Sequence, residues 1–115
     1  MADAFDEEEL LDRVDNDLEF LAETVQMLQD DGRSTMQQIR DALAAGDAPS
    51  VGRAAHALKG MVSNFCSPQT QASALAVEQM GKSGDLSAAP EAVRILGDRL
   101  EALQGELAAF VKERT

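Results

Sequence analysis

The chain has 115 residues and a net charge of −11, which argues against nucleic acid and anionic membrane surfaces as partners. Hydrophobic residues make up 44% of it, enough for a single domain with one core, which we assign to residues 1–115. One cysteine cannot form an internal disulfide, and one histidine with one cysteine makes a poor zinc site, so we expect no metal or cofactor of its own.

No apolar run approaches the roughly 18 residues of a membrane span, and the acidic N-terminus lacks the order of a signal peptide. We therefore expect a soluble, cytoplasmic monomer. The start at Met1 and the polar end at Thr115 favour a free-standing chain. Because Trp and Tyr are absent and there are only four Phe, the core must consist of Leu, Val, Ala and Met, a mixture that favours helices.

The first helix is predicted over residues 6–14, after a loose segment at residues 1–5. Its acidic start suits the positive end of a helix dipole. The second is predicted over residues 17–45, although Asp30-Asp31-Gly32 leaves open a break into two helices. Its core stripe follows alternating steps of three and four residues, typical of a bundle helix, at Leu18, Leu21, Val25, Leu28, Gly32, Thr35, Ile39 and Ala42. Phe20, Met27 and Leu43 are predicted to widen it.

Gly46 and Asp47 separate the second helix from a third over residues 48–64. Ser67, as N-cap, and Pro68 begin a fourth over residues 68–82, which Gly81 and Gly84 end.

The fifth helix is predicted from Asp85 or Ser87 to about residue 112. Four long amphipathic helices with short connections predict an all-α fold. We expect an antiparallel up-down four-helix bundle with the short N-terminal helix as an end cap.

The third helix carries the only histidine, His56, on the side away from its apolar residues. A core stripe within about 60° of one direction is formed by Val51, Ala54, Leu58, Met61, Val62 and Phe65. His56 points roughly 160° from that stripe, on the side of Gly52, Arg53, Gly60 and Ser63. Gly inside a helix costs about 1 kcal/mol against Ala. Gly60, one turn after the histidine, therefore indicates clearance for an approaching molecule. The alternative is an ordinary surface histidine.

The segment Ala55-His56-Ala57-Leu58-Lys59-Gly60 resembles the AHxLKG signature of histidine-containing phosphotransfer (HPt) domains of two-component phosphorelays. The resemblance extends over about residues 10–111 and includes Asp47 and the segment Leu75-Ala76-Val77-Glu78, while Met61 and Cys66 depart from the family pattern.

The resemblance implies that His56 is a phosphoacceptor in a carrier rather than an enzyme. The carrier would take a phosphoryl group from one receiver-domain aspartate and pass it to another. The magnesium would belong to the partner, the receiver domain of a response regulator or hybrid histidine kinase.

Three further side chains can be assigned around His56. Lys59, one turn on, could donate to phosphoryl oxygens, or it could be an ordinary solvated lysine. Arg53 is a weaker helper or a solvated charge, and Cys66 is expected to be a packing residue.

Glu78 is the predicted acceptor for His56 Nδ1, an arrangement that leaves Nε2 as the nucleophile. His56 lies eleven residues before Ser67 and Glu78 eleven after it, so an antiparallel helix pair puts them level. Gln79 is the alternative acceptor. The alternative without a functional role is that Glu78 is an ordinary solvated glutamate on the surface of its helix.

Two other classes of function stay open. A non-catalytic adaptor, or an HPt-like bundle that carries no phosphate, would bind a signalling partner only. A metal or haem bundle would need more His, Cys or inward-facing carboxylates than this sequence provides.

Overall fold

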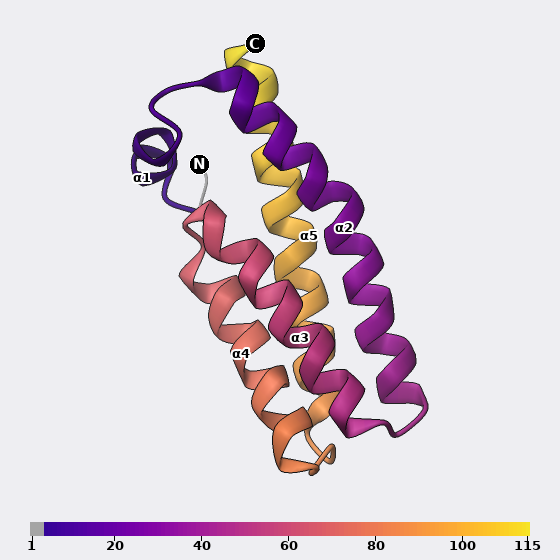
Figure 1. Cartoon of the computed structure of the whole chain (residues 1–115). Coiled ribbons are helices and arrows are strands. Elements are labelled where there is room, and N and C mark those ends of the chain that lie inside the picture. Colours follow the sequence, from indigo (N-terminus) through magenta and orange to yellow (C-terminus); the bar gives the residue numbers. More distant parts are fainter. Residues whose placement is uncertain (1–3) are drawn as a thin grey trace.

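The computed structural model describes residues 4–115, and within this range the chain forms helices and no strand (Figure 1). The elements are α1 (Glu7–Arg13), α2 (Leu18–Ala44), α3 (Ala48–Val62), the short 3-10 helix η1 (Ser63–Phe65), α4 (Pro68–Ser83) and α5 (Ala89–Arg114). The predicted all-α class is confirmed, and α2 continues through Gly32 without a break.

The four long helices lie lengthwise beside one another in a body of 43 × 20 × 19 Å (Figure 1). α3 packs against α2 and α4, and α5 packs against the same two helices from the other side. The closest association is between α3 and α4. The pair that carries His56 and Glu78 is therefore the most tightly packed in the molecule.

Aspartate side chains begin the first three helices. Asp6 accepts a hydrogen bond from the Glu9 amide at 3.0 Å and Asp17 from the Phe20 amide at 3.0 Å. Asp47 accepts from the Ser50 amide at 3.2 Å. Each satisfies an amide that the first turn leaves without a partner. Gly46 and Gly84, both with positive φ, follow the ends of α2 and α4.

α4 begins at Pro68 with Ser67 at its N-cap position, as predicted, but the Ser67 side chain makes no capping bond and its hydroxyl donates to Thr70 Oγ1 at 2.8 Å. The boundaries of α5 differ from the predicted ones. α5 begins at Ala89 rather than at Asp85 or Ser87, because Asp85 instead accepts the Ser87 amide within the preceding turn. α5 also extends to Arg114, whose guanidinium stacks over the Phe110 ring 3.7 Å from its centroid.

Residues 4–6, which precede α1, are held against the helices. Phe5 is 4% exposed, and its ring meets Phe110 edge to face with the centroids 5.4 Å apart. The Asp6 amide donates to the Cys66 carbonyl at 2.9 Å. The prediction of a loose segment is therefore wrong for Ala4 and Phe5, and residues 1–3 lie outside the described range.

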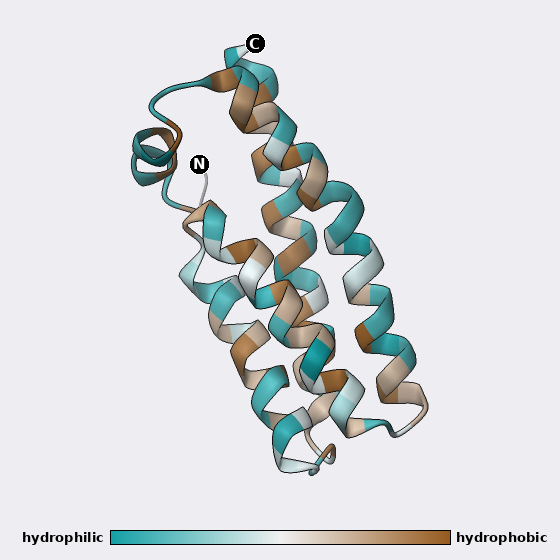
Figure 2. Ribbon diagram, in the orientation of Figure 1, coloured by the Kyte–Doolittle hydropathy of each residue, from teal (hydrophilic) through white to brown (hydrophobic). Residues whose placement is uncertain are grey.

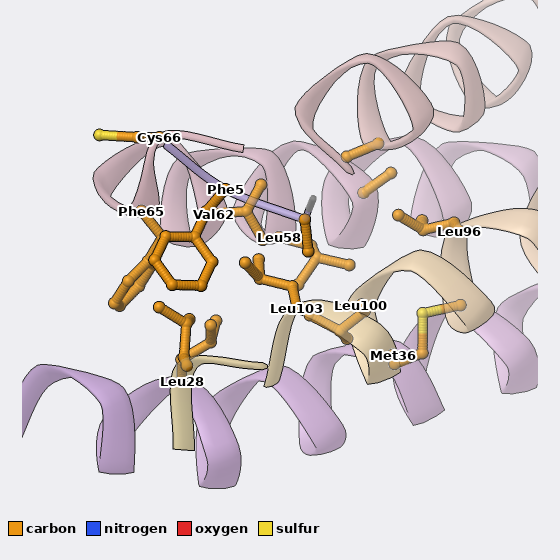
Figure 3. Packing of buried hydrophobic residues seen from close by; sticks show 14 of the residues in the cluster. Phe5, Leu28, Met36, Leu58, Val62, Phe65, Cys66, Leu96, Leu100 and Leu103 are labelled. Atoms are coloured by element: carbon orange, nitrogen blue, oxygen red, sulfur yellow. The ribbon is translucent and has the colours of Figure 1, made fainter. Parts of the chain in front are cut away.

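The core is aliphatic, with phenylalanines at one end. Figure 2 shows hydrophobic and hydrophilic residues alternating along the long helices, as expected of helices with one buried side. Leu28, Leu58, Val62, Leu100 and Leu103 belong to one buried cluster (Figure 3). Phe20 and Met27 do not widen the buried stripe of α2 as predicted, because they are 51% and 61% exposed. No helix between residues 4 and 115 is long and apolar enough to span a membrane.

Candidate functional site

Helix α3 presents His56 to solvent because its other side is occupied by the core. Val51, Ala55, Leu58 and Val62 are all fully buried. The side chain of His56 is 67% exposed. The ring is therefore fixed on a rigid helix and open to another molecule.

Glu78 lies beneath this ring on α4. His56 Nδ1 is 2.8 Å from Glu78 Oε2, which is the contact that the hairpin count predicts. Lys59 Nζ is 2.7 Å from Oε1, and Lys82 Nζ is 3.0 Å from Oε2. Glu78 is only 1% exposed, because its carboxylate is covered by the three side chains that contact it, which themselves reach the surface. Gln79, the alternative acceptor, is exposed on the neighbouring side of α4.

The lysines keep the carboxylate ionised. The ammonium groups of Lys59 and Lys82, which pair with its oxygens, lower the pKa of Glu78 to about 2, against a smaller opposing effect of burial, and His56 contributes a further lowering. An ionised carboxylate only accepts hydrogen bonds, so the hydrogen between the two groups belongs to Nδ1. Nε2 of the neutral imidazole then carries the free lone pair.

Gly60 leaves space beside the ring. A Cβ built at this position meets no atom within 4 Å, and the residue lies one turn after His56 on an exposed part of α3. No neighbour therefore requires a glycine here for packing, and the space beside the ring is open; its use by an approaching partner stays a prediction.

A shallow hollow surrounds the exposed side of His56. It is lined from α3 and α4 by Pro49, Gly52, Arg53, His56, Glu78, Gly81 and Lys82. Arg53 contributes a cation at its edge, where its guanidinium donates to Ser50 Oγ at 2.9 Å. The hollow therefore combines a free imidazole nitrogen with positive charge, a suitable environment for an anionic group.

Comparison with known proteins decides the family. The model of the Hpt domain matches residues 23–106. The chain belongs to the Hpt domain family. Proteins of this family are phosphotransfer carriers, so membership supports a histidine phosphotransfer role in phosphorelays. No curated protein matches the chain.

A solved structure shares the fold of this Hpt domain. The chain is similar to the crystal structure of histidine-containing phosphotransfer protein B (HptB) from Pseudomonas aeruginosa PAO1, with a TM-score of 0.90. The alignment covers 98% of each chain at 18% sequence identity. At this identity the likeness concerns the arrangement of the helices.

The structure places two glycines of this Hpt domain differently from the sequence-based prediction. Gly52 does not face solvent beside His56 but is buried against α4, and Gly81 does not end α4, which continues to Ser83. A Cβ on Gly81 would lie 2.3 Å from the Gly52 nitrogen. The two backbones are in direct contact, which is why the floor of the hollow has no large side chains.

Lys82 is the site residue that the sequence analysis missed. It stands four residues after Glu78 on the same helix, a spacing at which a Glu and a following Lys attract each other. That signal was available, but exposed lysines at this spacing are common. Lys59, expected beside a phosphoryl group, lies on the carboxylate in the unphosphorylated protein.

The remaining predictions concern packing and metals. Cys66 is buried, and burial raises the pKa of its thiol. It adopts φ 55°, a left-handed conformation that glycine adopts most readily. Within residues 4–115, no cluster of three or more His, Cys, Asp or Glu side chains could hold a metal ion.

Proposed function

We propose that this Hpt domain relays a phosphoryl group between receiver-domain aspartates, with His56 as its phosphoacceptor. The observation that carries the proposal is the exposed imidazole whose Nδ1 is held 2.8 Å from the buried carboxylate of Glu78. The domain is a carrier rather than an enzyme, because the acceptor aspartate and the magnesium belong to the receiver. His56, Lys59, Gly60 and Glu78 are its functional residues.

The transfer step follows from the hydrogen on Nδ1. The Nε2 lone pair attacks the phosphorus of an aspartyl phosphate, and the bond from phosphorus to the aspartate oxygen breaks. The aspartate leaves as a carboxylate with that electron pair. The ring becomes a phosphorylated imidazolium that keeps its Nδ1 hydrogen, and the adjacent Glu78 carboxylate stabilises the new positive charge. The reverse attack by a second receiver's aspartate restores the neutral ring.

A receiver could contact a surface next to His56. His56 and Gly60 follow one another by one turn along α3, and Asn64 continues the same row four residues later in η1. Asn64 also lines an open apolar hollow together with the exposed side chains of Phe20 and Met27. Large exposed apolar side chains grouped in this way are typical of protein-binding surfaces. We assign this surface to the receiver.

We also propose the domain organisation and fold that carry the site. Residues 1–115 form one domain, an antiparallel up-down four-helix bundle with α1 at one end, and the order and pairing of the helices support this fold. We propose a cytoplasmic monomer that acts with the receivers of response regulators or hybrid kinases, without nucleic acid, membrane or a cofactor of its own.

The test is incubation with phosphorylated receiver domains from the same genome, each with magnesium. We expect acid-labile phosphate to pass rapidly from at least one receiver to the Hpt domain and from it to a second. Stable binding of a receiver without any transfer would instead identify the chain as a non-catalytic adaptor.

A further inference from the structure

The two lysines beside Glu78 occupy different oxygens of its carboxylate. Lys59 lies 2.7 Å from Oε1. Lys82 lies 3.0 Å from Oε2, the oxygen that also accepts from His56 Nδ1 at 2.8 Å. Removal of Lys59 would therefore leave Oε1 without its cation. Removal of Lys82 would leave Oε2 with the histidine as its partner.

The lysines also differ in their freedom to move. The side chain of Lys59 is 27% exposed, whereas that of Lys82 is 71% exposed. A lysine ammonium on a flexible four-carbon stem can move from one partner to another at little cost when it stays in contact with water before and after the move. Of the two lysines, only Lys82 is exposed enough to do so.

The hollow around His56 distinguishes them further. Lys82 lines it together with the ring, and Lys59 does not. Because Lys82 Nζ and His56 Nδ1 share Oε2, the ammonium already lies within two hydrogen-bond lengths of the imidazole. A group attached to the ring from the hollow would meet Lys82 before Lys59.

Phosphorylation changes the competition for Oε2. The phosphorylated ring is a cation, and its Nδ1 hydrogen makes a stronger, charge-assisted bond to the carboxylate. The phosphoryl group brings about two negative charges and three acceptor oxygens next to the ring. Both changes favour transfer of the second cation from Oε2 to the phosphoryl oxygens.

We propose that Lys82 leaves Glu78 when His56 is phosphorylated and binds the phosphoryl oxygens on Nε2, while Lys59 stays on Glu78 and positions the ring. This inference rests on His56 being the phosphoacceptor of the proposed function. It assigns the phosphoryl contact to Lys82 and gives Lys59 a positioning role.

The direct test observes both lysine ammonium groups by NMR in the full chain, before and after chemical phosphorylation of His56 with phosphoramidate. We expect the Lys82 signal to shift and to couple to phosphorus, and the Lys59 signal to stay. A shift of Lys59 with Lys82 unchanged would overturn the assignment.

Variants give a second measurement, the equilibrium of phosphoryl exchange with a receiver. Lys82→Met should lower the phosphorylated fraction of the Hpt domain relative to the receiver about tenfold, the loss of one charge-assisted hydrogen bond. Lys82→Arg should restore the equilibrium. Lys59→Met should change the equilibrium less than Lys82→Met does, because Lys59 stays on Oε1 and makes no phosphoryl contact.

The outcomes separate this inference from the proposed function. If a receiver phosphorylates the chain and Lys82→Met has the wild-type equilibrium, the Lys82 assignment is wrong and the relay function stands. If no receiver phosphorylates the chain but chemical phosphorylation shifts the Lys82 signal, the relay function is wrong and the lysine exchange stands.

Discussion

At the residue scale, one buried carboxylate organises the site. Glu78 orients the imidazole, and two lysines keep it charged although it is only 1% exposed. A buried, ionised carboxylate is costly unless each oxygen has a cationic partner. The lysines thus make it possible for a charged acceptor to lie directly under the imidazole of His56.

The low pKa of Glu78 predicts how stability depends on pH. The folded pKa is about 2, below the ordinary value of 4.5, so the ionised group stabilises the fold fully above pH 4.5. This contribution is lost as the pH falls from 4.5 towards 2. Glu78→Gln should therefore lower the free energy of unfolding by about 1–3 kcal/mol at pH 7, and by much less near pH 2.

Urea denaturation of both proteins at several pH values measures this difference. Because the other carboxylates titrate alike in the two proteins, the difference isolates Glu78. A wild-type advantage that stays constant from pH 7 to pH 2 would contradict the assigned ionisation.

Variants at Gly60 distinguish its effect on the stability of the fold from its effect on the access of a receiver to His56. Gly60→Ala should raise the free energy of unfolding by up to about 1 kcal/mol, because the position is helical and no neighbour obstructs a Cβ. Gly60→Leu should fold as well, yet slow phosphoryl transfer at least tenfold by obstructing the receiver. Stopped-flow transfer assays with both variants test this, and a wild-type rate for Gly60→Leu would place the receiver on another surface.

At the element scale, the contact between α3 and α4 sets the geometry of the site. Gly52 and Gly81 bring the two backbones together, and Glu78 lies one turn before Gly81. The height of Glu78 opposite His56 could be predicted by counting residues from the turn, because antiparallel neighbours preserve that count. The distance between the helices could not, since it depends on which small residues of the two helices meet.

Gly81→Ala should therefore be strongly destabilising. Its Cβ would lie 2.3 Å from the Gly52 nitrogen and 2.8 Å from the Ala48 carbonyl oxygen, and backbone atoms cannot rotate away. We expect a loss of about 3 kcal/mol in the free energy of unfolding. Gly52→Ala is the matched control: its Cβ would meet α4 at 3.4 Å, so the change should stay within about 1 kcal/mol. Equal effects in urea denaturation would contradict this packing.

At the scale of the whole molecule, the helices were predictable from periodicity and capping residues, and the ends of the chain were not. Phe5 is ordered by Phe110, and α5 is extended by Arg114 stacking on that same ring. The Phe5 contact joins residues 105 positions apart, so no local pattern predicts it, whereas the Arg114 contact spans one turn of α5 and depends on side-chain stacking rather than on helix propensity. Phe20 and Met27 were assigned to the core because hydropathy alone does not distinguish a buried stripe from an exposed apolar surface.

That surface gives a prediction about partner binding. Met27→Glu introduces charge at a position 61% exposed, so it should change the free energy of unfolding by less than about 0.5 kcal/mol. It should weaken receiver binding at least tenfold, because the partner would have to cover a charge. Titration calorimetry with a cognate receiver, with Gln26→Glu as the charge-matched neighbour, tests this. Equal weakening by both variants would indicate a general electrostatic effect.

The most direct test of the central claim is to identify the atom that carries the phosphoryl group after transfer from a receiver, by phosphorus and nitrogen NMR. We predict acid-labile phosphate on Nε2 of His56, with Nδ1 still bonded to its hydrogen. His56→Gln should unfold like the wild type, because it removes no core contact, and should accept no phosphate. Phosphate on Nδ1, or acid-labile phosphate in His56→Gln, would contradict the account.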